Sequence, residues 1–485
     1  MPKNLNEIKT VFENNAYDIE DIIHGLFKKF NFKTICCKSG TSKEQGYSVS
    51  TIIILMTILP LLCLKSVSKF FSSKYTIITD MKKDVSYRFK NNSKVAWRNI
   101  LLLTAKKFSS LTDEENSAST NSIKARNTNT KAFILDDTID CKTGRKIEHI
   151  SYVHDHVGVN KGSKLGFKHL VLGYYDGTSI IPLDFTIQKE KELTKKKKKE
   201  QYSKKIHKNT HGYKRRKETT KSKITNSLSM VRRAVKKGFK ADYVIVDSWF
   251  PSYDFIKDIR AIKDGELHVI GGIKKDKRKY SFDGKALNAK EIIEKLKAKG
   301  KEKRNRKYNT RYFETTVQYG ELGSVKLFFC SFPHQKTWRL FISTDLNLDM
   351  GKFLETYAIR WTIEVMFKEM KQYLCFGKCQ SRDFDAHIAQ ATISCLLFIF
   401  LSYLKRKQDY ETIGGIFDYI EEDLKEKTIA EKIWHIFEEL LEKVISCLTE
   451  QGSINIREFK KSIEYKFIKE LFEESFLSNQ LKNVV

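Results

Sequence analysis

Several features are missing from this chain, and each absence argues against a class of protein. Its nine cysteines include no Cys-x2-Cys pair, and no second pair or histidine cluster accompanies Cys375 and Cys379 to complete a zinc site. Scattered cysteines of this kind are typical of a reducing cytoplasm. The opening segment is polar, so we expect no secretory signal.

Long hydrophobic runs are also scarce. The most apolar stretch, Thr51 to Leu64, has 14 residues and contains Pro60. A helix needs about 20 apolar residues to span a bilayer. The stretch therefore predicts a buried helix, and we expect no membrane partner.

Positive charge is what the chain has in excess. It carries a net charge of +30 over 485 residues, which makes nucleic acid the natural partner. Residues 189–223 hold 16 Lys or Arg against 4 Glu. This run predicts a mobile loop or arm on the DNA backbone, with a merely solvated segment as the alternative. Residues 408–485 have 17 acidic and 10 basic side chains and are not expected to bind DNA directly.

The segment from Tyr357 to Lys371 carries the most informative pattern. At about 100° per residue of an α-helix, four polar side chains fall within an arc of roughly 60°; they are Tyr357, Arg360, Glu364 and Lys371. A separate apolar face predicts packing against a core; it comprises Ile359, Ile363, Met366, Phe367, Met370 and Leu374. Such a polar face suits phosphodiester chemistry, and ordinary charge pairs on a solvated helix are the alternative.

Two further acidic candidates follow apolar segments that read as buried strands. Residues 132–135 precede Asp136 and Asp137, and residues 243–246 precede Asp247. A two-metal site usually draws its oxygen ligands from three acidic side chains, so two acids in addition to Glu364 are expected. An acid that merely ends a strand or enters a turn is the alternative interpretation of each.

The pattern Y-x2-R-x3-E-x6-K in residues 357–371 resembles the signature of the IS4 family of bacterial insertion-sequence transposases. The resemblance implies an α/β fold with an RNase H-like core, as in DDE transposases and retroviral integrases, and a β-rich insertion. In that fold the first Asp lies on the first strand, the second follows the fourth strand, and the Glu lies on a later helix. The same order occurs here. The family's first motif favours Asp136, and Asp137 remains the alternative.

The predicted organisation follows from this resemblance and from the composition of each segment. The regions are a helical N-terminal DNA-binding domain (1–107), a linker (108–131), the first part of the catalytic core (132–260), the β-rich insertion (261–339), the second part of the core (340–404) and a helical, acidic C-terminal dimerisation region (405–485). Residues 80–102 could form a helix-turn-helix, with a plain helical hairpin as the alternative. The basic side chains expected near phosphates there are Lys82, Lys83, Arg88, Lys90 and Lys94.

The activity that the resemblance implies is metal-dependent cut-and-paste transposition. Asp136, Asp247 and Glu364 would hold two metal ions, with Mg²⁺ expected and Mn²⁺ as a substitute. Each end of the element would be nicked, released through a hairpin and joined to target DNA. The implied partners are double-stranded DNA, as terminal inverted repeats and target, and a second copy of the chain in a homodimer. We expect a cytoplasmic, nucleoid-associated protein.

Four residues are expected to contact DNA on the same grounds. Tyr357, Arg360 and Lys371 would position terminal phosphates, and Trp338 would stack on a base flipped out during hairpin formation. A buried core tryptophan is the alternative for Trp338. A catalytically inactive, transposase-derived DNA-binding protein is the alternative for the whole chain.

Overall fold

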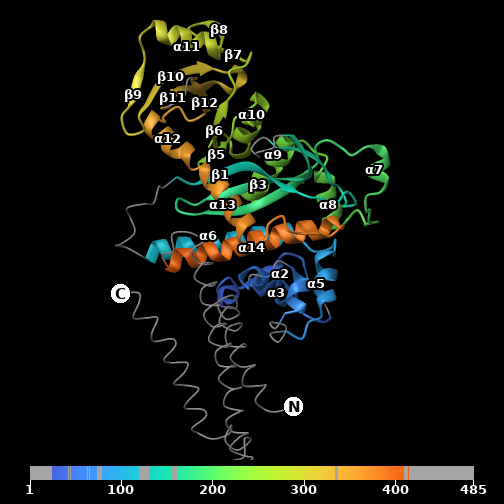
Figure 1. Ribbon diagram of the computed structural model, residues 1–485. Helices are drawn as coiled ribbons and strands as arrows, with labels where there is room; N and C mark the ends of the chain where they lie inside the picture. The colour runs from blue at the N-terminus through green and yellow to red at the C-terminus, as the bar shows by residue number, and fades with distance from the viewer. Residues whose placement is uncertain are drawn as a thin grey trace, which may run out of the picture.

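The computed structural model describes residues 25–118, 130–155, 162–333, 337–408 and 413, apart from positions 42, 44, 63, 65 and 74–78. The predicted C-terminal dimerisation region lies almost wholly outside the described residues. Within the described part, one large mixed sheet is flanked by helices (Figure 1). The predicted α/β class is confirmed.

The sheet contains twelve strands in the order β2-β3-β1-β5-β6-β12-β11-β10-β7-β8, with β4 paired to β3 and β9 to β10. Strands β1, β5 and β6 are parallel, and β3 lies antiparallel to β1. The strands are β1 (Ala132–Cys141), β2 (Ser151–Asp155), β3 (Gly162–Tyr175), β4 (Ile180–Gln188), β5 (Tyr243–Val246), β6 (His268–Ile273), β7 (Lys279–Phe282), β8 (Lys285–Asn288), β9 (Lys303–Asn305), β10 (Thr310–Gln318), β11 (Ser324–Ser331) and β12 (Arg339–Ser343).

The strands predicted for the β-rich insertion do form. Strands β6 to β11 lie within the predicted range of 261–339. Strand β6 pairs in parallel with β5 on one side and antiparallel with β12 on the other. The predicted insertion therefore continues the sheet of the core instead of forming a separate one.

Helices cover both faces of the sheet. Adjacent residues of a strand point to opposite faces. A Cβ at Gly173 of β3 would lie 3.5 Å from Ile363 of α13, whereas the Tyr174 hydroxyl donates to the carbonyl of Lys240, just beyond α9. The helices are α2 (Phe32–Lys38), α3 (Val49–Leu61), α4 (Val67–Phe71), α5 (Lys83–Lys90), α6 (Trp97–Ala118), α7 (Lys195–Lys199), α8 (His211–Glu218), α9 (Lys223–Lys236), α10 (Tyr253–Arg260), α11 (Ala289–Ala298), α12 (Met350–Ala358), α13 (Trp361–Gln372) and α14 (Phe384–Gln408).

Helix α14 lies beside α6 between the sheet and the N-terminal helices (Figure 1). Residues 384–406 are long and apolar enough to cross a membrane, but 89% of their most apolar window is buried in the structure. That burial is what a core helix requires. The apolar stretch near residue 51 forms α3, which is buried as predicted.

Helix α6 differs from the sequence-based prediction in two ways. It runs to Ala118, past the predicted start of the linker at 108, because Phe108 and Leu111 are buried and keep the helix on the core. Its first turns are buried too, and Arg98 pairs with Asp184 of β4 at 2.8 Å. A helix enclosed in this way cannot enter a DNA groove. Of the two interpretations of residues 80–102, these contacts favour the plain helical hairpin over the helix-turn-helix.

The basic run at 189–223 is also corrected in part. Arg215 and Arg216 of α8 are buried and do not reach solvent. Arg216 binds Glu148 through two nitrogens, at 2.9 and 2.6 Å, and Asp385 at 2.8 Å. These contacts join α8, the loop before β2 and α14. The DNA-contact prediction therefore fails for these two arginines, whose role is to hold the fold together.

Replacing Arg216 by methionine should lower the free energy of unfolding by about 3–5 kcal/mol, because it leaves buried carboxylates without their partner. Denaturant unfolding followed by circular dichroism measures the change. Arg88→Met is the control, since Arg88 pairs with Asp84 at the surface, where their side chains are 76% and 58% exposed. Equal stability of the Arg216 variant and the wild type would contradict the structural role.

Candidate active site

Strand register brings the two candidate aspartates to one edge of the sheet. The parallel pairing of β1 with β5 aligns Leu135 with Val246, so the next residues, Asp136 and Asp247, lie side by side. Pairing of β5 with β6 places Gly272 at the same level. Residues 111 positions apart in the sequence thus meet where parallel strands end, which is a common place for ligand sites in α/β sheets.

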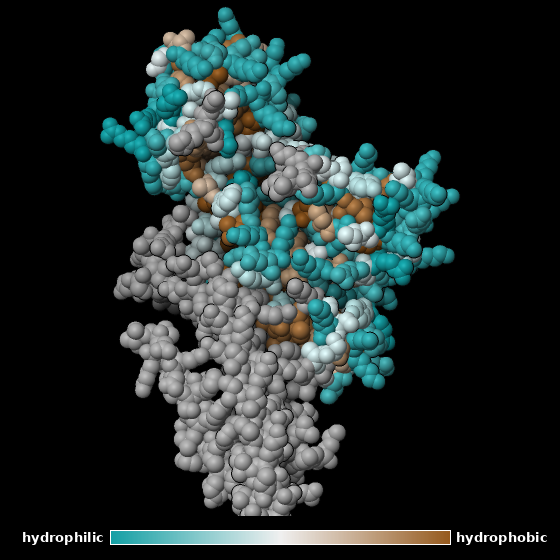
Figure 2. All heavy atoms as spheres, in the orientation of Figure 1, coloured by the Kyte–Doolittle hydropathy of each residue, from teal (hydrophilic) through white to brown (hydrophobic). Residues whose placement is uncertain are grey.

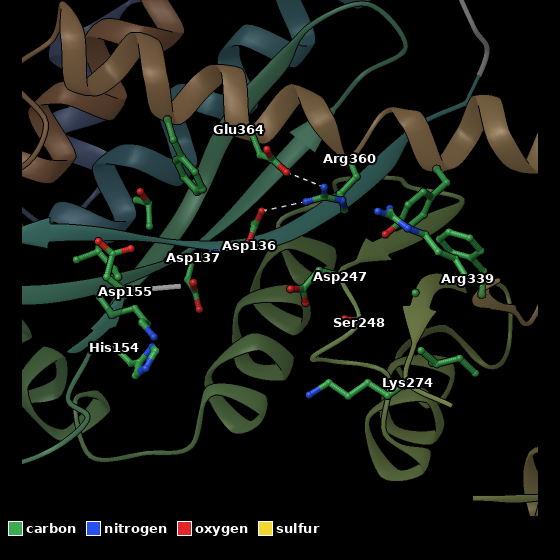
Figure 3. Close-up of a pocket in the computed structure, with 18 of the residues that line it drawn as sticks. Asp136, Asp137, His154, Asp155, Asp247, Ser248, Lys274, Arg339, Arg360 and Glu364 are labelled. Carbon is green, nitrogen blue, oxygen red and sulfur yellow. Dashed lines mark hydrogen bonds and ion pairs between the residues drawn. The ribbon is translucent and has the colours of Figure 1, made fainter. Parts of the chain in front are cut away.

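Glu364 reaches the same place from α13, above the sheet (Figure 3). The prediction of one continuous helix from Tyr357 to Lys371 is wrong, because α12 ends at Ala358 and α13 begins at Trp361. At the junction the backbone makes tighter bonds between residues three apart, such as that from the Arg360 N–H to the Tyr357 carbonyl at 3.0 Å. The predicted apolar face is buried along its length.

Arg360 links two of the three carboxylates. Its Nη1 donates to Asp136 Oδ2 at 3.2 Å, and its Nη2 lies 2.6 Å from Glu364 Oε1 (Figure 3). The Asp247 carboxylate faces the same space and accepts the backbone N–H of Trp249 at 3.1 Å. The guanidinium therefore occupies the position between carboxylates where a cation is expected.

Negative charge in the site is only partly compensated. The pKa of Asp136 is raised from 3.8 to about 7, mainly by burial and also by the nearby carboxylates of Asp137 and Asp247. The Asp137 N–H and the Arg360 guanidinium act in the opposite direction. A buried carboxylate that resists ionisation in this way would bind an additional cation favourably.

Asp137, the alternative first acid, has a different environment. Its carboxylate forms an ion pair with Lys223, the first residue of α9. Asp136 instead shares Arg360 with Glu364. Both acids line the cleft, but Asp136 is the one connected to Glu364 through Arg360, so the contacts favour it.

The four predicted DNA-contact residues all line one cleft of about 980 Å³ together with the three acids. Tyr357 stacks near-parallel to Phe353, and burial raises the pKa of its hydroxyl. Lys371 donates to the carbonyl of Ile139 at 2.9 Å, so part of its role is to hold β1. Trp338 packs against Phe313 with ring centroids 5.0 Å apart.

Sequence reasoning missed much of the basic wall of this cleft. Lys274 and Lys275 follow β6, and Arg339 opens β12 (Figure 3). The signal that could have located Lys274 is the apolar strand before it, since the carboxyl end of a strand parallel to β5 must lie beside Asp247. Figure 2 shows hydrophilic side chains covering the outer parts of the molecule around α11 and α7.

The donor set fits a hard divalent cation. Three carboxylates open into the cleft, and oxygen ligands of this type suit Mg²⁺. Among the described residues no group of three or more His, Cys, Asp and Glu side chains is already drawn close enough to hold a metal ion. Arg360 would therefore have to release Asp136 and Glu364 as a cation entered.

A mixed sheet with three acids and several cations around one cleft is an arrangement suited to phosphodiester chemistry. Residues 175–400 match the family model described as Transposase DDE domain. This domain implies transposase function and DNA binding, and its family comprises nucleases and strand transferases, which generally use a divalent metal. The match includes Asp247 and Glu364 and begins after Asp136. A search of curated proteins found no match.

The raised pKa of Asp136 predicts a pH-dependent stability difference in metal-free protein. Between pH 3.8 and about 7 the folded state holds a proton that the unfolded state has lost, so stability falls as pH rises through this window. Asp136→Asn removes this effect. The variant should match the wild type near pH 4 and exceed it by about 1–4 kcal/mol at pH 8.

Thermal or denaturant unfolding in the presence of a chelator measures this difference. Asp80→Asn, at an exposed position, is the control and should show no such trend. A difference between Asp136→Asn and the wild type that stays constant with pH would show that Asp136 is not held in this environment.

Proposed function

We propose that this chain is a cut-and-paste transposase of the IS4 family that binds the terminal inverted repeats of an insertion sequence. Its core is RNase H-like. The strand order β4-β3-β1-β5 supports this assignment, since β3 runs antiparallel to β1 and β5 runs parallel to it. Strand β6, from the predicted insertion, continues this order beside β5. The reaction proceeds by nicking of one strand at each end, hairpin formation, hairpin opening and strand transfer.

One observation carries the proposal. Asp136, Asp247 and Glu364 come from three separate elements and open into one cleft beside cationic side chains. Charged side chains at a strand end or on a solvated helix have no reason to converge in this way. The convergence supports their assignment as the catalytic acids.

The residues of the chain divide the work by their chemistry. Arg360 grips a terminal phosphate once it releases Asp136 and Glu364, since its planar group can bind two phosphate oxygens together. Lys371 holds β1 in position, and its charge attracts the DNA strand. Tyr357, stacked on Phe353, supports Arg360, whose guanidinium carbon lies 6.0 Å from the tyrosine ring centre.

Asp136, Asp247 and Glu364 would hold Mg²⁺, or Mn²⁺ in its place. When bound, such a cation polarises the phosphate and lowers the pKa of the attacking hydroxyl or water. The basic wall that includes Lys274 and Lys275 keeps the DNA backbone against these acids. The protein acts in the cytoplasm as a homodimer on DNA, with the region 405–485 as its proposed dimer contact.

An excision assay tests the proposal. A marker is placed between the native flanking sequences of the gene, and its loss is scored with wild-type protein, Glu364→Gln and Glu369→Gln. Glu369 lies on the same helix as Glu364, outside the cleft lining, and is the matched control. We expect excision by the wild type and the control and at least a 100-fold loss in Glu364→Gln, as for a group on which phosphoryl transfer depends.

DNA binding by Glu364→Gln should remain, because affinity comes mainly from phosphate contacts. Excision by Glu364→Gln at the wild-type rate would contradict the proposal. Binding of the flanking DNA without excision by any variant would favour the inactive DNA-binding protein.

Trp338 is predicted to act at the hairpin step. Trp338→Ala should nick an end-bearing duplex at the normal rate but form or open hairpins poorly, because stacking on a flipped base contributes about 1–3 kcal/mol. Denaturing gels separate nicked, hairpin and opened products. Trp338→Phe keeps an aromatic face and its packing on Phe313, and should retain most hairpin formation. Equal loss at the nicking step would refute this role.

A further inference from the structure

Trp249 is an exposed aromatic residue that the proposed function leaves unused. It lies two residues after Asp247, and its side chain is 56% exposed, whereas the neighbouring Phe250 is fully buried. Burying an indole is worth more than burying almost any other side chain. An indole left in solvent beside a candidate catalytic acid therefore indicates a surface on which a ligand could bind.

The position of Trp249 is fixed by the site itself. Its backbone N–H donates to Asp247 Oδ1 at 3.1 Å. The ammonium of Lys223 lies 4.7 Å from the ring centre of Trp249 and 4.3 Å from the ring centre of Phe250. Lys223 also pairs with Asp137 in the cleft. One ammonium thus connects the indole to the cleft wall and covers one face of the ring, and the exposed fraction leaves the rest open.

The residues around Trp249 favour a nucleobase over a protein as the ligand of the indole. Large exposed apolar patches mark protein docking sites. Trp249 instead has charged or polar neighbours in Lys223, Ser248 and Asp247, and the apolar Phe250 next to it is buried. A single flat ring beside a cation matches the platforms on which proteins stack unpaired bases, where the cation serves the adjoining phosphate.

We propose that Trp249 stacks on an unpaired base of the DNA strand whose phosphate lies at Asp136 and Asp247. The indole and Lys223 form a platform on α9 and the loop after β5, separate from Trp338, which directly precedes β12. This inference rests on the proposed function, because it requires a DNA strand in the cleft. It assigns the recognition of an unpaired base to a second aromatic residue.

Binding to defined DNA probes tests the platform. The full chain, in the presence of a chelator to prevent cleavage, is titrated into a fluorescent oligothymidine of about 16 nucleotides and into a blunt duplex of the same length. Fluorescence anisotropy gives the dissociation constants for the wild type, Trp249→Ala and Trp249→Phe. Unfolding curves verify that each variant is folded, as expected at an exposed position.

Trp249→Ala should bind the oligothymidine about 5- to 150-fold more weakly than the wild type, and Trp249→Phe should bind it nearly as well as the wild type. Binding of the blunt duplex should change little, because its bases are already stacked. Irradiation of a 5-iodouracil oligonucleotide bound to the wild type should cross-link the peptide that contains Trp249.

Three results would overturn the inference. They are unchanged oligothymidine binding by Trp249→Ala, equal weakening for both probes, and a loss of dimerisation by this variant, which would make the indole a contact with a second copy. If excision by the wild type depends on Glu364 and Trp249→Ala binds the oligothymidine as well as the wild type does, the platform alone is refuted. A wild-type protein that binds neither probe would refute the proposed function and the platform together.

Discussion

The site depends on the parallel pairing of β1 with β5. Aligning Leu135 with Val246 places Asp136 and Asp247 at one level of the sheet. A shift of the register by one residue would turn every side chain of a strand to the other face and separate the two carboxylates. The buried residues of both strands prevent that shift, because they would have to leave the core. Core packing thus sets the geometry of the acids.

The same arrangement creates an electrostatic cost that the surrounding cations offset. Burial and, to a lesser extent, the neighbouring carboxylates raise the pKa of Asp136, so negative charge in this cleft is costly. Arg360 compensates on the side of Glu364, and Lys223 compensates on the side of Asp137. In the proposed function, both cations would also meet phosphate. The free protein is therefore stabilised by contacts that DNA and a divalent cation would replace.

The sequence predicted what local patterns encode and missed what long-range packing decides. Apolar strands ending in Asp136 and Asp247 and the apolar face of α13 were readable, because periodicity and strand exits are local. The break between α12 and α13 was not, since it depends on a few tighter backbone bonds. Arg216 looked like a DNA contact because its partners, Glu148 and Asp385, are distant in sequence. Lys274 was missed because its position follows from sheet order.

In the proposed function, Asp136, Asp247 and Glu364 together hold a divalent cation on bound DNA. The most direct measurement is the anomalous scattering of Mn²⁺ in crystals of the full chain bound to end-bearing DNA. The account predicts Mn²⁺ peaks coordinated by all three carboxylates, with Arg360 released from Asp136 and Glu364 and turned to phosphate. Peaks that leave out any one of the three acids, or a DNA complex in which Arg360 still bridges Asp136 and Glu364 without a cation, would contradict it.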